Sequence, residues 1–237
     1  MKRIVVIFLL AAAALLTGCT FVRFNPGSFS TSSSGERVVG SKDLSTISYT
    51  VPQFTGIDMT INADIDYTVS ADQEASIVVE APENLIDKLY FEVEDGVLMV
   101  RFSDDRNYTY KEINVRASSA TLEKLDIRGA GDFDAHGGLD CKSLEIEIQG
   151  AGDVDMDGVR CEGDLSVRVR GAGDVDLHDI SCEEVTVEIM GAGDVSLSGK
   201  AARADLSIKG AGDIDIRHLD VADVGTSIAG IGSIQRK

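Results

Sequence analysis

The chain has no tryptophan, only three prolines in 237 residues, and few basic side chains. With 43% hydrophobic residues and 24 glycines, this composition indicates an ordered fold built from small residues rather than a disordered chain. Its 22 lysines and arginines are set against 40 aspartates and glutamates, for a formal net charge of −18. That excess argues against nucleic acid and anionic membrane surfaces as partners.

The sequence also lacks the motifs of common enzyme chemistry. It contains no Gly-x-Ser-x-Gly, no phosphate-binding loop and no zinc-binding helix motif. Its four cysteines include no closely spaced CxxC pair, which zinc and redox sites use. We therefore expect no catalytic residue, no resident metal and no cofactor, apart from calcium as considered below.

One long apolar run is present, at residues 4–16 after Lys2 and Arg3. It is too short for a comfortable membrane span, and the sequence LTGC follows it, ending at Cys19. LTGC resembles the lipobox of bacterial lipoproteins, in which the cysteine is lipidated and becomes the new N-terminus. We expect a signal peptide at 1–18 and lipidation at Cys19, with an ordinary secretory signal and an incidental cysteine as the alternative.

A lipidated cysteine predicts an envelope protein. Several acyl chains would hold the chain firmly to a membrane, whereas one chain alone is marginal. The residue after Cys19 is Thr20, whereas an Asp at this position would resemble an inner-membrane retention signal. The outer membrane is therefore the expected location, and the sequence does not indicate which leaflet the protein faces. Residues 19–46 are rich in Ser, Thr and Gly and are predicted to be a flexible tether.

From residue 47 the pattern is typical of β-strands. FTGIDMTINADIDYTV and KLYFEVEDGVLMVRF alternate apolar and polar positions. Residues 81–89 are expected to form a short helical turn or a loop. NADIDY at 62–67 is similar to the later repeat, so we predict that 47–120 is an N-terminal β region of degenerate repeats that caps one end.

Residues 121–237 repeat a glycine motif about every 20 residues. GAGD starts at Gly129, Gly150, Gly171, Gly191 and Gly210, and GIGS starts at Gly230. Apolar residues recur four and six positions after the first glycine of each GAGD and two positions before the next corner. Each repeat is thus expected to hold two short strands that are apolar on one face.

Such a unit cannot bury its apolar face alone, so successive units must stack. We predict an all-β fold, a parallel β-helix or β-solenoid whose strands pair about 4.8 Å apart, with a β-sandwich as the rival. The glycines are expected at the corners because glycine reaches positive φ without a penalty from Cβ.

Two columns of acidic residues follow the corners and form the candidate ligand or cation face. Three explanations remain open: carboxylates that cap the turns, plain solvated surface, and a ladder for calcium or another hard cation. Neighbouring charges at this spacing repel by roughly 1 kcal/mol in water. The members are Asp132, Asp153, Asp174, Asp194 and Asp213 in the first column, and Asp134, Asp155, Asp176 and Asp215, with Ser196, in the second.

Two further columns carry residues of chemical interest. The first column holds Cys141, Cys161 and Cys182, continued by Ala202 and Val221. We expect its cysteines to be buried thiols, with one disulfide between coils as the alternative. The second column holds His136, Asp157, His178, Ser198 and Arg217. We expect these to be polar loop positions, with a metal or substrate site as the alternative. Arg170 and Lys209, just before two corners, are expected to neutralise nearby aspartates.

The opening FTGIDMTINADIDYTV, the segment GVLMVRF and the repeated GAGD corners together resemble the bacterial autotransporter-adhesin, head GIN domain family, over residues 47–237. The resemblance implies a right-handed β-helix with glycine-centred turns and a role in cell-surface adhesion. It implies no catalytic residues.

We therefore expect a lipid-anchored, non-enzymatic protein whose repetitive face binds a glycan or a protein. A structural or accessory component of the envelope is the alternative. A polysaccharide-degrading enzyme is a third possibility, which rests on fold analogy alone.

Overall fold

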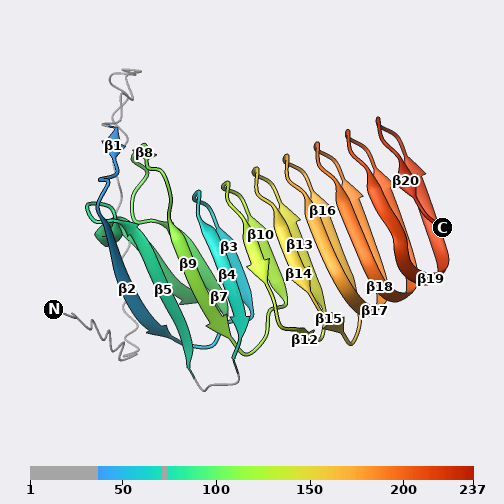
Figure 1. The fold of residues 1–237 in the computed structure, drawn as a ribbon, viewed down its shortest axis with the longest axis horizontal. Coiled ribbons are helices and arrows are strands. Elements are labelled where there is room, and N and C mark those ends of the chain that lie inside the picture. Colours follow the sequence, from blue (N-terminus) through green and yellow to red (C-terminus); the bar gives the residue numbers. More distant parts are fainter. Residues whose placement is uncertain (1–36, 71–73) are drawn as a thin grey trace, which may run out of the picture.

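The computed structural model describes residues 37–70 and 74–237, so the predicted signal peptide at 1–18, Cys19 and most of the predicted tether lie outside the described residues. The described chain is almost entirely β, with one short 3-10 turn, η1 (Ile86–Lys88). Its parallel coils stack into a β-solenoid of about five turns, which confirms the predicted fold class (Figure 1). None of the helical segments in the described part is long and apolar enough to cross a membrane.

Two long columns of parallel strands run along the solenoid. The first contains β3 (Gly56–Met59), β10 (Lys124–Ile127), β13 (Leu144–Ile148) and β16 (Leu165–Val169), and then the final segments of β17 (Val175–Ile189), β18 (Val195–Ile208) and β19 (Ile214–Ile228). The second contains β4 (Asp64–Val69), β11 (Phe133–Ala135) and β14 (Val154–Asp157), then the first segments of β17 to β19, and β20 (Ile234–Gln235).

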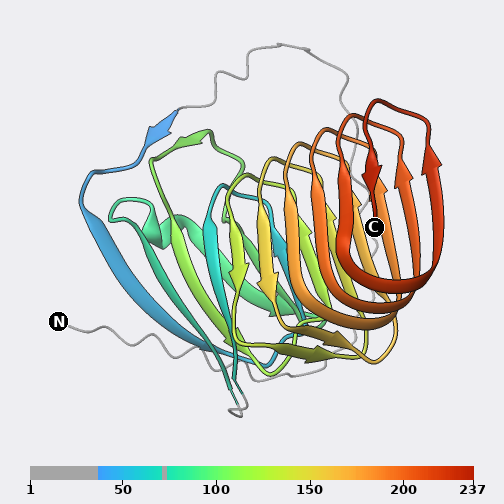
Figure 2. The same ribbon diagram turned by 45° about the vertical axis from the view of Figure 1, so that its right-hand side comes forward.

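A third, short column of strands, which the repeat pattern did not predict, lies at the corner opposite the GAGD turns. It begins with β12 (Leu139–Cys141) and β15 (Val159–Cys161). In the last coils the strands β17, β18 and β19 run through this corner without a break, and Figure 2 shows them as bent ribbons. Each regular coil therefore has two long sides and one short one.

The N-terminal part extends both columns with antiparallel strands. β2 (Leu44–Val51) pairs with β5 (Ala75–Pro82), which pairs with β9 (Asn114–Ser119), and β9 lies parallel to β4. On the other side, β6 (Leu89–Glu94) and β7 (Val97–Phe102) form a hairpin beside β3. Its two turn residues, Asp95 and Gly96, have φ of 50° and 80°, as a two-residue hairpin turn requires.

Two expectations for this region can be compared with the structure. The ordered fold begins before the predicted boundary at 46, because β2 starts at Leu44 and β1 (Val38–Val39) pairs with β8 (Tyr108–Thr109). The similarity of NADIDY to the later repeats is confirmed, since Ile65 pairs with Phe133 and continues its column.

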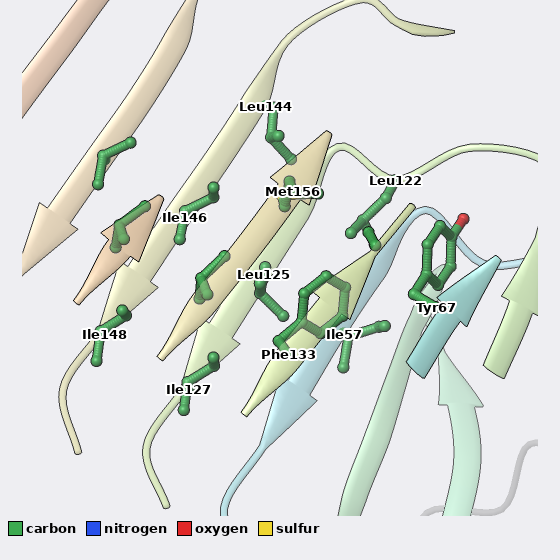
Figure 3. Close-up of a cluster of buried hydrophobic side chains, with 14 of the residues drawn as sticks. Ile57, Tyr67, Leu122, Leu125, Ile127, Phe133, Leu144, Ile146, Ile148 and Met156 are labelled. Carbon is green, nitrogen blue, oxygen red and sulfur yellow. The ribbon is translucent and has the colours of Figure 1, made fainter. Parts of the chain in front are cut away.

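The apolar columns form one continuous core along the solenoid axis. Phe133, Val154, Val175, Val195 and Ile214 are at most 1% exposed, as the spacing of the repeat predicts. Figure 3 shows how side chains of successive coils lie against each other in this core, with Phe133 near Tyr67 and Ile57. Ile228 is the exception in its column, because it is 50% exposed on β19.

The reason for glycine at the corners differs from the expected one. Among the glycines of the GAGD and GIGS corners, only Gly131 has a φ in the left-handed region, at 132°. The decisive factor is the close approach of successive backbones. The amide of Ala172 donates to the carbonyl of Gly150 at 2.9 Å, and a Cβ on Gly171 would lie 1.8 Å from that same oxygen. A side chain at this position would force the two coils apart.

We predict that Gly171→Val destabilises the protein by about 3 kcal/mol or more, because backbone rather than a flexible side chain blocks the new Cβ. Chemical denaturation followed by circular dichroism measures the effect.

Ser166→Ala on the neighbouring strand β16 is the control. The Ser166 hydroxyl is buried and has no hydrogen-bond partner, so its removal should leave stability within about 0.5 kcal/mol of wild type or raise it. Equal unfolding midpoints for the two variants would contradict the close-contact explanation.

Candidate functional site

The first acidic column hydrogen-bonds the corners of successive coils. In each case Oδ1 of one aspartate accepts the backbone N–H of the equivalent residue in the next coil. The donor–acceptor distances are 3.1 Å for Asp132 to Asp64, 2.9 Å for Asp174 to Asp153, 2.8 Å for Asp194 to Asp174, 2.7 Å for Asp213 to Asp194 and 2.6 Å for Ser233 to Asp213. The capping explanation is thus confirmed for the carboxylates of Asp153, Asp174, Asp194 and Asp213.

Asp174 illustrates how one residue joins three coils. Its N–H donates to the carboxylate of Asp153 in the preceding coil, and its carbonyl accepts from the amide of Val154 in that coil. Its own carboxylate accepts from Asp194 in the following coil. This carboxylate is engaged in the fold, so it is a poor candidate for holding a ligand.

The second acidic column lies on the outer face of the second strand column. Asp134, Asp155 and Asp176 are in direct parallel register, and Asp66, which the sequence analysis did not assign to the column, precedes them. Ser196 interrupts the row and separates Asp215 from it. Four carboxylates therefore stand next to one another at the spacing of parallel strands, about 4.8 Å.

The two ends of this column differ electrostatically. Partial burial, with the neighbouring charge of Asp66 as a further cause, raises the pKa of Asp134. At the other end, Arg217 binds Asp215 at 2.6 Å and lowers its pKa to about 2. Arg116 on β9 is in register with Asp66. The acidic surface therefore runs from Asp134 to Asp176, with Arg116 beside Asp66 at one end and Asp215 neutralised by Arg217 at the other.

Arg170 and Lys209 pair with glutamates on the first strand column, which corrects the expectation that these two residues neutralise aspartates. Arg170 pairs with Glu147, and Lys209 pairs with Glu188, each in the preceding coil. The hydrogen bond from Lys209 lowers the pKa of Glu188. Arg128 makes the equivalent pair with Asp58. This face is a ladder of ion pairs between coils, whereas the second acidic column is largely unpaired.

The cysteine column lies at the corner opposite the glycines. Cys141 and Cys161 are paired in register and buried, with their Sγ atoms 3.1 Å apart, while Cys182 is partly exposed. All three are thiols, as expected, and burial raises the pKa of Cys182 to about 11. The column continues through Ala201 rather than the predicted Ala202, because the register shifts by one residue between Leu177 and Ile180.

The expected histidine column is only partly formed. Asp157 pairs with His178, and Nδ1 of His178 lies 3.5 Å from the hydroxyl of Ser198. A register shift after Ser196 places His218, instead of the predicted Arg217, opposite Ser198. Within the residues that the structure describes, no group of three or more His, Cys, Asp and Glu side chains is arranged to hold a metal ion.

The comparison with protein families is decisive for classification. A family model described as "Putative auto-transporter adhesin, head GIN domain" matches residues 53–163 and 159–236. The chain belongs to this family. Membership indicates an adhesin-like protein of the cell envelope or surface. A search of the curated proteins gives no match to this head GIN domain.

Solved structures share the fold of this head GIN domain. A protein from Bacteroides fragilis described as a "putative adhesin" is 24% identical, with a TM-score of 0.68 over 84% of this chain and 100% of its own. A "putative lipid binding protein" from Parabacteroides distasonis is 20% identical, with a TM-score of 0.69 over 85% and 100%. A "putative adhesin" from Parabacteroides merdae is 19% identical, with a TM-score of 0.53 over 84% and 99%.

Asp174→Ala is predicted to lower stability by about 1–2 kcal/mol, since it leaves the amide of Asp194 without its acceptor. Asp176→Ala, two residues further along the chain on β17, is the matched control. It removes an exposed carboxylate from a repulsive row, so stability should change by less than about 0.5 kcal/mol. Urea unfolding of both variants makes the comparison; an equal loss in both would contradict the assignment of different roles to the two columns.

The raised pKa of Asp134 predicts a pH-dependent effect of Asp134→Asn. A carboxyl whose pKa is higher in the folded state penalises folding when it is ionised, above its folded pKa, and the penalty disappears below the unfolded pKa. The variant should therefore melt a few degrees above wild type at pH 7, by about 1–3 °C, and this advantage should vanish near pH 3. A constant difference across the pH range would rule out this electrostatic cause.

Proposed function

We propose that this chain is a lipid-anchored protein of the outer membrane that acts as a non-enzymatic, adhesin-like binding module. The observation that carries the proposal is membership of the adhesin family across residues 53–236. The lipobox-like LTGC at Cys19 supports the anchor. The described fold begins at β1, so about 18 residues after Cys19 are left to connect the anchor to it.

The solenoid suits multivalent binding. Equivalent side chains recur in register along its outer faces, so a long ligand would meet the same chemistry in each coil. The row from Asp134 to Asp176 favours a cationic protein segment or a glycan bridged by calcium over a polyanion. Calcium takes carboxylate oxygens readily, and it would relieve the repulsion in this row.

The carboxylate arrangement also distinguishes this proposal from a glycosidase-like enzyme. Hydrolysis of a glycosidic bond uses two carboxyl groups with different roles on either side of one bond. Here the carboxylates of the second column repeat on one face, in register from coil to coil. Such a row provides repeated contacts rather than one acid and one base.

The test is surface-plasmon retention of residues 20–237 on immobilised envelope and host polysaccharides and matrix proteins, with calcium and with a chelator. We expect retention that weakens in Asp134→Asn/Asp155→Asn/Asp176→Asn. The control is Asp140→Asn/Glu162→Gln/Asp164→Asn, which makes the same change in charge at the corner that holds the cysteines. This variant should be retained like wild type.

Two other outcomes would indicate a different function. No retention on any surface, together with loss of envelope integrity on deletion, would favour a structural or accessory component. Release of soluble sugar from a retained polysaccharide would contradict the non-enzymatic assignment.

A further inference from the structure

Residues 103–113, between β7 and β9, leave the regular solenoid and build a pocket beside the first corner. This connection is longer than a glycine corner such as 149–153, and Figure 1 shows its strand β8 at the upper edge of the molecule, next to β1. The pocket has a volume of about 420 Å³, within the range of small-molecule sites. Its lining includes Thr60, Asn62, Arg106, Asn107, Tyr108 and Tyr110.

Aromatic rings form one wall of this pocket, in a chain that is only 5% aromatic. Phe102 and Tyr108 stack with their ring centroids 3.8 Å apart, and Tyr110 meets Phe102 edge to face at 5.6 Å. All three side chains are partly exposed. Phe102 covers one face of the Tyr108 ring, and the guanidinium of Arg106 lies over this ring at 5.9 Å from its centroid. Elsewhere along the glycine corners the backbones are in contact, so the regular repeat leaves no comparable space at those positions.

The wall is fixed in place by the N-terminal strand. The amide of Val38 donates to the carbonyl of Asn107 at 2.9 Å, and the amide of Gly40 donates to that of Thr109 at 2.8 Å. Arg37 adds a hydrogen bond to the hydroxyl of Thr109 at 2.9 Å. A wall held before the ligand arrives reduces the entropic cost of binding.

The charge of the pocket is balanced internally. Arg106 donates to Oδ2 of Asp104 from Nε at 3.0 Å and from a terminal nitrogen at 2.7 Å, while the hydroxyl of Tyr108 donates to Oδ1 at 2.7 Å. These bonds hold the pKa of Asp104 well below its usual range, so the pair stays ionised and has no net charge. A ligand anion would find no excess positive charge here, on a chain whose net charge is −18.

Hydrogen-bonding groups remain available around the rings. The hydroxyl of Tyr110 accepts the amide N–H of Asn62 at 3.1 Å, which leaves its own proton to be donated. The side-chain oxygen of Asn62 accepts from the amide of Ala130 at 3.0 Å, which leaves its NH₂ group for a ligand. Aromatic surface surrounded by planar hydrogen-bonding groups, without net charge, matches a sugar ring, which has apolar C–H faces and a rim of hydroxyls.

We propose that this aromatic pocket binds a neutral hexose unit of a glycan. The inference rests on the proposed binding function and deepens it: the pocket supplies one specific saccharide contact, and the repeated acidic face supplies additional weak ones. The site thus lies where the repeat is interrupted, at the end of the row of corners.

The test is titration of the purified mature chain with neutral trisaccharides of glucose, galactose and mannose, followed by calorimetry and by NMR of the tyrosine rings. At least one trisaccharide should bind, and Tyr108→Ala should weaken it by about tenfold or more. Tyr90→Ala is the matched control, because Tyr90 lies on β6 outside the pocket and also has an arginine, Arg101, over its ring at 4.4 Å. It should bind within about twofold of wild type.

Tyr108→Phe distinguishes loss of binding from loss of folding, because it keeps the ring and removes only the hydrogen bond to Asp104. It should melt like wild type and show an intermediate loss. Binding that is unchanged in both Tyr108 variants would overturn the pocket and leave the binding function intact. Absence of trisaccharide binding, in a protein that is still retained on matrix protein surfaces, would also overturn the pocket alone. Absence of all retention would overturn both proposals.

Discussion

From the second GAGD corner onward, the residue after the first corner glycine donates its amide N–H to the carbonyl of a glycine in the preceding coil, at 2.8–3.0 Å. The donor is an alanine in four of these corners and Ile231 in the last. This bond requires the two backbones to approach so closely that the glycine of the upper coil has no room for a Cβ. The sheets on either side depend on it, because the corner sets the register in which Val154, Val175 and their equivalents stack. The aspartate that follows reinforces the same junction through its side chain.

The sequence was sufficient to predict the periodicity, the buried columns and the alignment of NADIDY, since each depends on spacing within one repeat. The third short strand at β12 and β15 was missed because only three residues contribute and its apolar members are few. Predictions that crossed a change in repeat length failed by one residue, as with Ala202 and Arg217. Spacing alone does not show on which side of a corner a residue is inserted or lost.

The candidate site was predictable only in outline. Both aspartate columns were visible in the sequence, but their different roles depend on which carboxylate reaches an amide of the next coil. Asp174 does, whereas Asp176 points outward from the sheet face. The aromatic pocket had no sequence signal, because Phe102, Tyr108 and Asn62 are brought together by contacts between distant segments. The regular repeat thus builds the solenoid, and the saccharide pocket that we propose lies where the repeat is interrupted.

The central claim is that the corners form one hydrogen-bonded column, and residue-resolved hydrogen exchange tests it most directly. The side chains of Ala151, Ala172, Ala192 and Ala211 are exposed, yet their amides donate to the preceding coil. We expect these amides to exchange as slowly as the amide of buried Val167, because exchange requires the coils to separate. Exchange as fast as that of an amide in an unstructured peptide would contradict it.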